Sequence, residues 1–210
     1  MVLQMKLNEL IDFELFNSIE TIFKAKKYVL TLFPWMLNVI GIRTSDMKMV
    51  NIFNDYIVLI WKDEIKVNTR IFPATTKPGL NLLKKPINKK GTAILVPEQY
   101  LNAYKKDLHN GKYQALCQRH FNVNVFRDSN KDSAFDLNPE TIESGFFGIN
   151  IHRASAFQKL PFVGANSAGC QVFQNPDDFN FMMNLVDKHI VRYKNSFTYT
   201  LLEEKDFEGV

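Results

Sequence analysis

The stretch Gly148–Phe173 reads GINIHRASAFQKLPFVGANSAGCQVF and joins an apolar alternating run to a turn that carries a cysteine. In its first part, isoleucines alternate with Asn150 and His152, so the spacing predicts a strand that places these two polar side chains on one face. Its last part is a small-residue turn that presents Cys170. The loop between them contains residues typical of a chain that reverses direction, namely Pro161, Gly164 and Asn166.

An imidazole at a strand end and a thiol in a Gly-Cys turn are the components of a Cys/His nucleophilic pair. A thiol is a weak nucleophile until a base or a positive environment converts it to a thiolate. Taken singly, a free cysteine is usually a buried apolar residue and a histidine a satisfied polar one. The combined pattern of strand, loop and Gly-Cys turn favours Cys170 as nucleophile and His152 as its base.

This pattern resembles the signature of the L,D-transpeptidase catalytic domain, a bacterial family that remodels peptidoglycan through a cysteine acyl-enzyme. The family signature is a histidine at a strand end, a loop of about fourteen residues and then Ser/Thr-His-Gly-Cys, often followed by an arginine. Here fourteen residues separate His152 from Ser167, and Cys170 follows His152 by eighteen positions. The spacing of the signature and its histidine, serine, glycine and cysteine are therefore present.

Three residues depart from the signature. Ala168 stands where the family has a second histidine, Val172 stands where the arginine usually follows, and Arg153 takes a position that is commonly small. The second histidine of the family is not the base, so the Cys/His pair is retained. The change at Val172 affects the orientation of substrate or the shape of the pocket, and Arg153 is a candidate for the missing positive charge.

The resemblance implies further site residues. The backbone carbonyl of Arg153 is expected to orient the His152 ring, and the N–H groups of Gly169 and Cys170 are expected to bind the oxyanion. Glycine at position 169 fits a turn with backbone angles that other residues avoid. The expected substrate-binding residues flank these groups and are Asn150, Asn166, Ser167 and Gln171.

A second, weaker resemblance lies at residues 70–79, RIFPATTKPG, where family members often run from a strand into a Ser/Thr-, Lys- and Gly-containing loop. Asp128, at the end of a later predicted strand, is interpreted as a loop-orienting residue. The alternative is that Arg127 or Asp128 lines the substrate groove.

The composition is that of an ordinary globular domain. The chain has 210 residues, of which 46% are hydrophobic and 23% charged, and a net charge of +4. Without a concentrated basic patch, this charge predicts no nucleic-acid partner, while an acidic cell-wall polymer remains compatible. His109 and His120 lack the spacing of metal ligands, so we expect neither a metal site nor a cofactor. Cys117 lies in an apolar segment and is expected in the core.

The N-terminal residues predict neither a signal peptide nor a membrane span, because acids interrupt every apolar run. We therefore expect a protein that is cytoplasmic as synthesised. For an enzyme of the cell wall this requires another route of release, as at lysis or as part of a bacteriophage virion. Residues 6–26 have the spacing of an amphipathic helix, expected to pack on its own domain or on a partner subunit.

The remaining elements are predominantly strands. We expect a turn and a short helix at 45–54, a hairpin over 55–72, a short helix at 100–108 and a helix over 176–189. Strands are expected at 39–43, 92–96, 113–118, 123–127 and 196–203, and a loose acidic tail from Glu203. The predicted class is α+β, predominantly β. The resemblance implies an L,D-transpeptidase-like β-sandwich with a few flanking helices in residues 39–210, after an N-terminal helix and connecting segment in residues 1–38.

Two functions follow from the sequence. The first is a cysteine-dependent acyl transferase or hydrolase that acts on peptidoglycan stem peptides through a thioester on Cys170. The alternative is a non-catalytic structural or binding protein, for example a phage virion component, that retains the fold.

Overall fold

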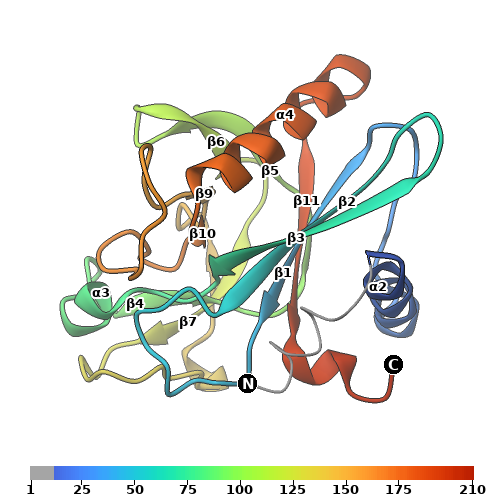
Figure 1. The fold of residues 1–210 in the computed structure, drawn as a ribbon. Helices are drawn as coiled ribbons and strands as arrows, with labels where there is room; N and C mark the ends of the chain where they lie inside the picture. Colours follow the sequence, from blue (N-terminus) through green and yellow to red (C-terminus); the bar gives the residue numbers. More distant parts are fainter. Residues whose placement is uncertain (1–11) are drawn as a thin grey trace.

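A computed structural model describes residues 12–210 and shows a predominantly β structure built on a closed barrel (Figure 1). Eight strands form the barrel in the order β1-β11-β5-β6-β9-β10-β3-β2, and a separate three-stranded sheet has the order β4-β7-β8. The barrel strands are β1 (Leu37–Arg43), β2 (Asp55–Lys62), β3 (Val67–Thr75), β5 (Gln99–His109), β6 (Tyr113–Gln118), β9 (Ile151–Arg153), β10 (Gln171–Phe173) and β11 (Phe197–Glu203). The small sheet contains β4 (Thr92–Leu95), β7 (Val123–Asp128) and β8 (Glu143–Gly145). The predicted class is confirmed, whereas the likeness to an L,D-transpeptidase sandwich stays a prediction.

The predicted hairpin is confirmed in β2 and β3, which pair antiparallel along their whole length. Asp63 closes the turn between them, because its carboxylate accepts hydrogen bonds from the N–H groups of Ile65 and Lys66 at 2.8 and 2.9 Å. Strand β2 is buried on both faces, since the barrel core lies inside it and a helix covers it outside.

The helix predicted at 100–108 is wrong, because these residues belong to β5. Strand β5 pairs with β6 across the turn at Asn110 and Gly111. Asn110 and Gly111 both have positive φ values, 51° and 70°, and Lys112 completes the three-residue connection, with its N–H donating to the His109 carbonyl at 3.0 Å. The hairpin places His109 directly opposite Tyr113.

Helix α4 (Pro176–Arg192) covers one end of the barrel, beside β1, β9 and β10 (Figure 1). It begins as predicted, with Pro176 in its first turn and the Asn175 side chain accepting a hydrogen bond from the Asp177 N–H. The helix extends three residues beyond the predicted end. Its apolar face belongs to the barrel core.

Helix α2 (Asp12–Lys26) packs on the outside of the barrel, where Ile19 and Phe23 join an apolar cluster with β1 and β2. For residues 12–26, the expected packing of the helix on its own domain is confirmed. Positions 6–11 of the predicted helix lie outside the described residues. The tail expected to be loose is ordered instead, because Glu204–Phe207 form a 3-10 helix and Asp206 pairs with Lys26 at 2.8 Å.

Two short segments complete the description. The helix expected at 45–54 is absent, and these residues form turns. The one helix between β3 and β4 is α3 (Leu80–Lys84). Among residues 12–210, no helix combines the length and apolar character that a bilayer crossing requires.

Candidate active site

The candidate site lies where the short strands β9 and β10 run parallel. Val172 pairs with His152 and Gln171 with Ile151, so Cys170, one residue earlier, lies beside Asn150. The Gln171 N–H donates to the Asn150 carbonyl at 2.9 Å and continues the ladder to this point. Because side chains alternate along a strand, Cys170 and His152 project from the same outer face of the barrel, at diagonal positions.

The thiol of Cys170 lies between two backbone groups. Its sulfur is 3.4 Å from the Gly148 carbonyl oxygen, to which it donates, and accepts from the Asn150 N–H at 3.4 Å. The residue is half-buried and forms no disulfide, and Cys117 is a separate free thiol in the core, as predicted. Burial raises the pKa of the Cys170 thiol to about 11, despite the opposing effect of the Asn150 N–H.

The ring of His152 is fixed from two sides. Its Nδ1 lies 2.9 Å from the carbonyl oxygen of Arg153, to which it donates, and the Tyr113 hydroxyl lies 3.3 Å from both atoms. The ring of His109 stacks on His152, with centroids 4.1 Å apart and planes 25° apart. Burial, followed by the charge that His109 would carry, lowers the pKa of His152 to about 3.

Both members of the pair are therefore neutral at physiological pH. Because Nδ1 donates to the Arg153 carbonyl, the lone pair of His152 is on Nε2. A neutral imidazole in this tautomer is the form that accepts a proton from a neutral thiol during attack. Within residues 12–210 the Cys170 sulfur is hydrogen-bonded to Gly148 and Asn150, and not to the His152 ring. What the two residues share is a face of the barrel and the neutral protonation states that general-base chemistry uses.

The turn before the cysteine is held by Ser167, which is fully buried. Its Oγ donates to the Cys170 carbonyl at 2.8 Å and accepts from the Gly169 N–H at 3.2 Å. Gly169 has φ +113°, and a Cβ there would lie 2.3 Å from the Ala93 carbonyl oxygen, so glycine is required. Since the Gly169 N–H is already bonded, the Cys170 N–H is the candidate oxyanion donor of the two.

Three of the residues expected to contact substrate form hydrogen bonds within the chain. The Gln171 side chain points into the barrel, accepts from the Tyr199 hydroxyl at 2.8 Å and donates to the Gly169 carbonyl at 3.0 Å. Asn150 is buried, with its side-chain oxygen accepting from the Gln118 N–H at 3.0 Å and its Nδ2 3.0 Å from Nδ1 of His109. With Ser167, these residues are bonded within the chain, so a positioning role describes them better than a substrate contact.

The two remaining site residues lie nearer the surface. Asn166 is half-buried, and its side chain donates to the Val163 carbonyl at 2.9 Å. The Arg153 guanidinium lies over the ring of Tyr113, 4.4 Å from its centroid, and 5.7 Å from that of Phe179. The backbone carbonyl of Arg153 thus orients the His152 ring, while the guanidinium of Arg153 lies over Tyr113.

The segment of the second resemblance adjoins the cysteine turn. The Gly79 N–H donates to the Ser167 carbonyl at 2.9 Å. A Cβ on Gly79 would lie 2.0 Å from the Gly164 carbonyl oxygen, so this segment and the loop before Cys170 are in close contact. The structure therefore brings together the two stretches that carry the resemblance.

Beneath this contact lies a group of buried charges. Lys77 Nζ is 3.0 Å from Asp55 Oδ1, and both side chains are almost completely buried. The other Asp55 oxygen accepts from the backbone and hydroxyl of Thr76, both at 2.8 Å. Arg43 donates to Thr76 from Nε at 3.0 Å and from Nη2 at 2.9 Å. These bonds fix the backbone that leads to Gly79.

Sequence patterns assign no role to His109, Tyr113 or the buried charges. His109 and Tyr113 reach His152 only because β5 and β6 form a hairpin. Its Asn-Gly turn was a usable signal, but the preceding residues were interpreted as a helix. No local pattern indicates the pairing of Asp55 with Lys77, because Asp55 begins β2 and Lys77 lies in the loop after β3.

Within residues 12–210, no three His, Cys, Asp or Glu side chains are grouped so that they could hold a metal ion. Comparison with known protein families, curated proteins and solved structures finds no match.

Proposed function

We propose that the protein is a cysteine-dependent acyl transferase or hydrolase that acts on peptidoglycan stem peptides. The observation that carries the proposal is the hydrogen bond from His152 Nδ1 to the Arg153 carbonyl. The His152 side chain lies on the same outer face of the barrel as Cys170. The hydrogen bond selects the tautomer in which Nε2 is the base. The choice of peptidoglycan as substrate depends on the sequence resemblance alone.

In the proposed reaction, the Cys170 sulfur attacks a peptide carbonyl carbon while His152 Nε2 takes the thiol proton. The Cys170 N–H stabilises the oxyanion of the tetrahedral intermediate. The carbon–nitrogen bond breaks, and the leaving amine receives the proton from His152, which leaves a thioester. An acceptor amine or water then attacks the thioester, gives its proton to His152 and releases the thiol.

Incubation with purified muropeptides, followed by mass spectrometry, tests this proposal. We expect shortened or cross-linked products with the wild-type chain and none with Cys170→Ala. The Cys117→Ala variant is the matched control, because it removes the other thiol and is expected to keep the products. Identical muropeptide profiles for wild type and Cys170→Ala would contradict the proposal.

The non-catalytic alternative is favoured by one observation, the raised pKa of the Cys170 thiol. A neutral, half-buried thiol is also the state of a structural cysteine. Alkylation kinetics separate the two functions. A catalyst requires that the rate of Cys170 alkylation depend on His152, whereas a structural thiol reacts slowly and equally in wild type and His152→Ala.

A further inference from the structure

A small pocket opens beside the cysteine turn, on the side of the three-stranded sheet. It has a volume of about 270 Å³, and its lining includes Ala168, Ala93, Arg127, Phe146 and Phe147. Two of these residues adjoin the thiol along the chain. Ala168 precedes Cys170 by two positions, and Phe147 precedes Gly148, whose carbonyl contacts the sulfur. The Ala93 carbonyl also lies against Gly169, the residue before the cysteine, so the wall of the pocket is in contact with the cysteine turn.

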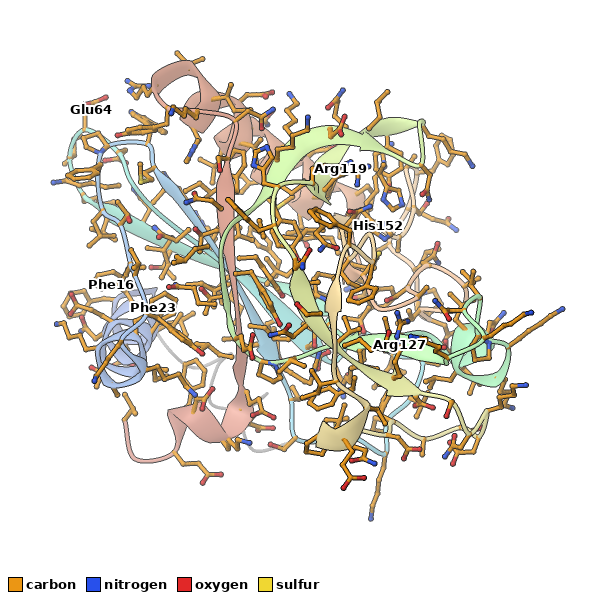
Figure 2. The ribbon with its side chains drawn as sticks, turned by 180° about the vertical axis from the view of Figure 1, so that it is seen from behind. Phe16, Phe23, Glu64, Arg119, Arg127 and His152 are labelled. Carbon is orange, nitrogen blue, oxygen red and sulfur yellow. The ribbon has the colours of Figure 1, made fainter. Side chains whose placement is uncertain are left out.

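Arg127 supplies the pocket with a fixed positive charge. Its side chain is largely buried, and its guanidinium lies over the ring of Phe147, 4.6 Å from the centroid. Nε donates to Glu143 at 3.0 Å and Nη1 to the Gly91 carbonyl at 3.3 Å. Nη2 makes no hydrogen bond within residues 12–210, so the guanidinium retains donors for a ligand. Figure 2 shows Arg127 and His152 on the same half of the molecule.

The charge balance around Arg127 favours an anion. Glu143 is shared, because one oxygen accepts from Arg127 and the other from Lys90. Two cations thus bind one acid, and no Asp or Glu is among the residues of 12–210 that line the pocket. Asn88 and Thr92 are the other polar side chains at the pocket, and the rest of its side-chain lining is apolar, including the exposed Phe146 and Ile87. An aliphatic stem with a carboxylate at its end fits both features.

We infer that this pocket binds a carboxylate carried on a short aliphatic stem of the acyl donor, and that Arg127 is the residue that recognises it. The inference rests on the proposed function, because it takes Cys170 as the acceptor of the acyl group. It assigns to the peptide substrate an acidic side chain or carboxyl terminus close to the scissile bond. Ala168 leaves the space that this group would occupy.

Two thiol reagents test the inference without any turnover. N-(5-carboxypentyl)maleimide and N-hexylmaleimide have stems of the same length, and only the first carries a carboxylate. In the Cys117→Ala background, we expect the ratio of their rates at Cys170 to fall about fivefold in Arg127→Gln, the effect of a partly exposed ion pair. Arg70→Gln, which removes the same charge from an exposed site on β3, is expected to leave the ratio unchanged.

Two further variants keep the test decisive if Arg127→Gln unfolds. Arg127→Lys preserves the charge and should retain part of the preference, and Ala168→Leu should remove it by filling the pocket. An unchanged ratio in Arg127→Gln and Ala168→Leu would overturn the inference. If the preference for the carboxylate reagent depends on Arg127 but muropeptides do not react, the proposed function is contradicted. The pocket would still be a carboxylate-binding site.

Discussion

Three charged residues, Lys77, Asp55 and Arg43, lie inside the molecule beneath the loop that meets the cysteine turn. Burial alone would raise the pKa of Asp55, but Lys77 and the N–H groups of Thr76 and Thr44 outweigh it and lower the pKa below its usual value. Replacing one member of such a pair leaves the other charge buried without compensation. The structure therefore makes Lys77 a residue on which folding depends.

We predict that Lys77→Met lowers the free energy of unfolding by about 3–5 kcal/mol at pH 7. Urea denaturation measures the change, with Lys84→Met as the control because Lys84 is exposed on α3. Since the folded-state pKa of Asp55 is lowered, its contribution is present above the unfolded pKa of about 3.9 and is lost as pH falls through the folded pKa. Equal stability of Lys77→Met and wild type at pH 7 would show that the pair does not support the fold.

At the scale of elements, the contact between residues 75–79 and the loop before Cys170 depends on Gly79. Its φ of −78° is available to any residue, so the need for glycine comes from the neighbouring Gly164 carbonyl. A methyl group at this position must push the two segments apart, and overpacking of this kind destabilises proteins by about 1–3 kcal/mol.

We predict that Gly79→Ala lowers stability by an amount in this range and speeds alkylation of Cys170, because the turn is released from its support. Ser144→Ala is the control, because Ser144 is exposed on β8. Thermal unfolding and thiol titration provide the two measurements. If Gly79→Ala is destabilised but Cys170 is alkylated at the wild-type rate, the loop contact does not support the cysteine turn.

The sequence predicted the elements whose patterns are regular. The β2–β3 hairpin has an apolar run with a polar turn, and α4 has a cap, a proline and a periodic apolar face. Strand β5 was missed because its pattern is interrupted. Asn102 has φ +53°, and the pairing with β11 shifts register between Phe197 and Tyr199. Such a bulge removes the alternation that identifies a strand.

At the scale of the whole molecule, closure of the barrel depends on pairings that no local pattern contains. Strand β1 pairs in parallel with β11, so residues 39–43 meet residues 199–203. The candidate site was predictable as a His-to-Cys spacing, and its two motif segments do meet. Its surroundings were not, because His109 and Asn150 are brought together by the pairing of β6 with both β5 and β9.

Burial also couples the whole fold to pH. His109, His152 and His189 each have a pKa lowered by burial, and that of His152 falls to about 3. A histidine with a lowered pKa binds fewer protons in the folded state, so stability rises with pH between the folded and unfolded values. We predict that the free energy of unfolding decreases as pH falls from about 6.5 toward 3.

Urea denaturation at pH 7 and pH 5 measures this dependence. Wild type and His152→Gln are compared at both pH values. In His152→Gln the slope should be smaller. Equal stability at pH 7 and pH 5 in the wild-type chain would contradict the buried, neutral state of these rings.

The most direct test of the Cys170–His152 pair is the mass of the protein itself after brief incubation with a stem peptide. We predict an acyl adduct on the tryptic peptide that contains Cys170 in the wild-type chain, a slower appearance of this adduct in His152→Ala, and none in Cys170→Ala. An unmodified Cys170 peptide in the wild-type chain, or an adduct that forms equally fast without His152, would contradict the assignment of these two residues as nucleophile and base.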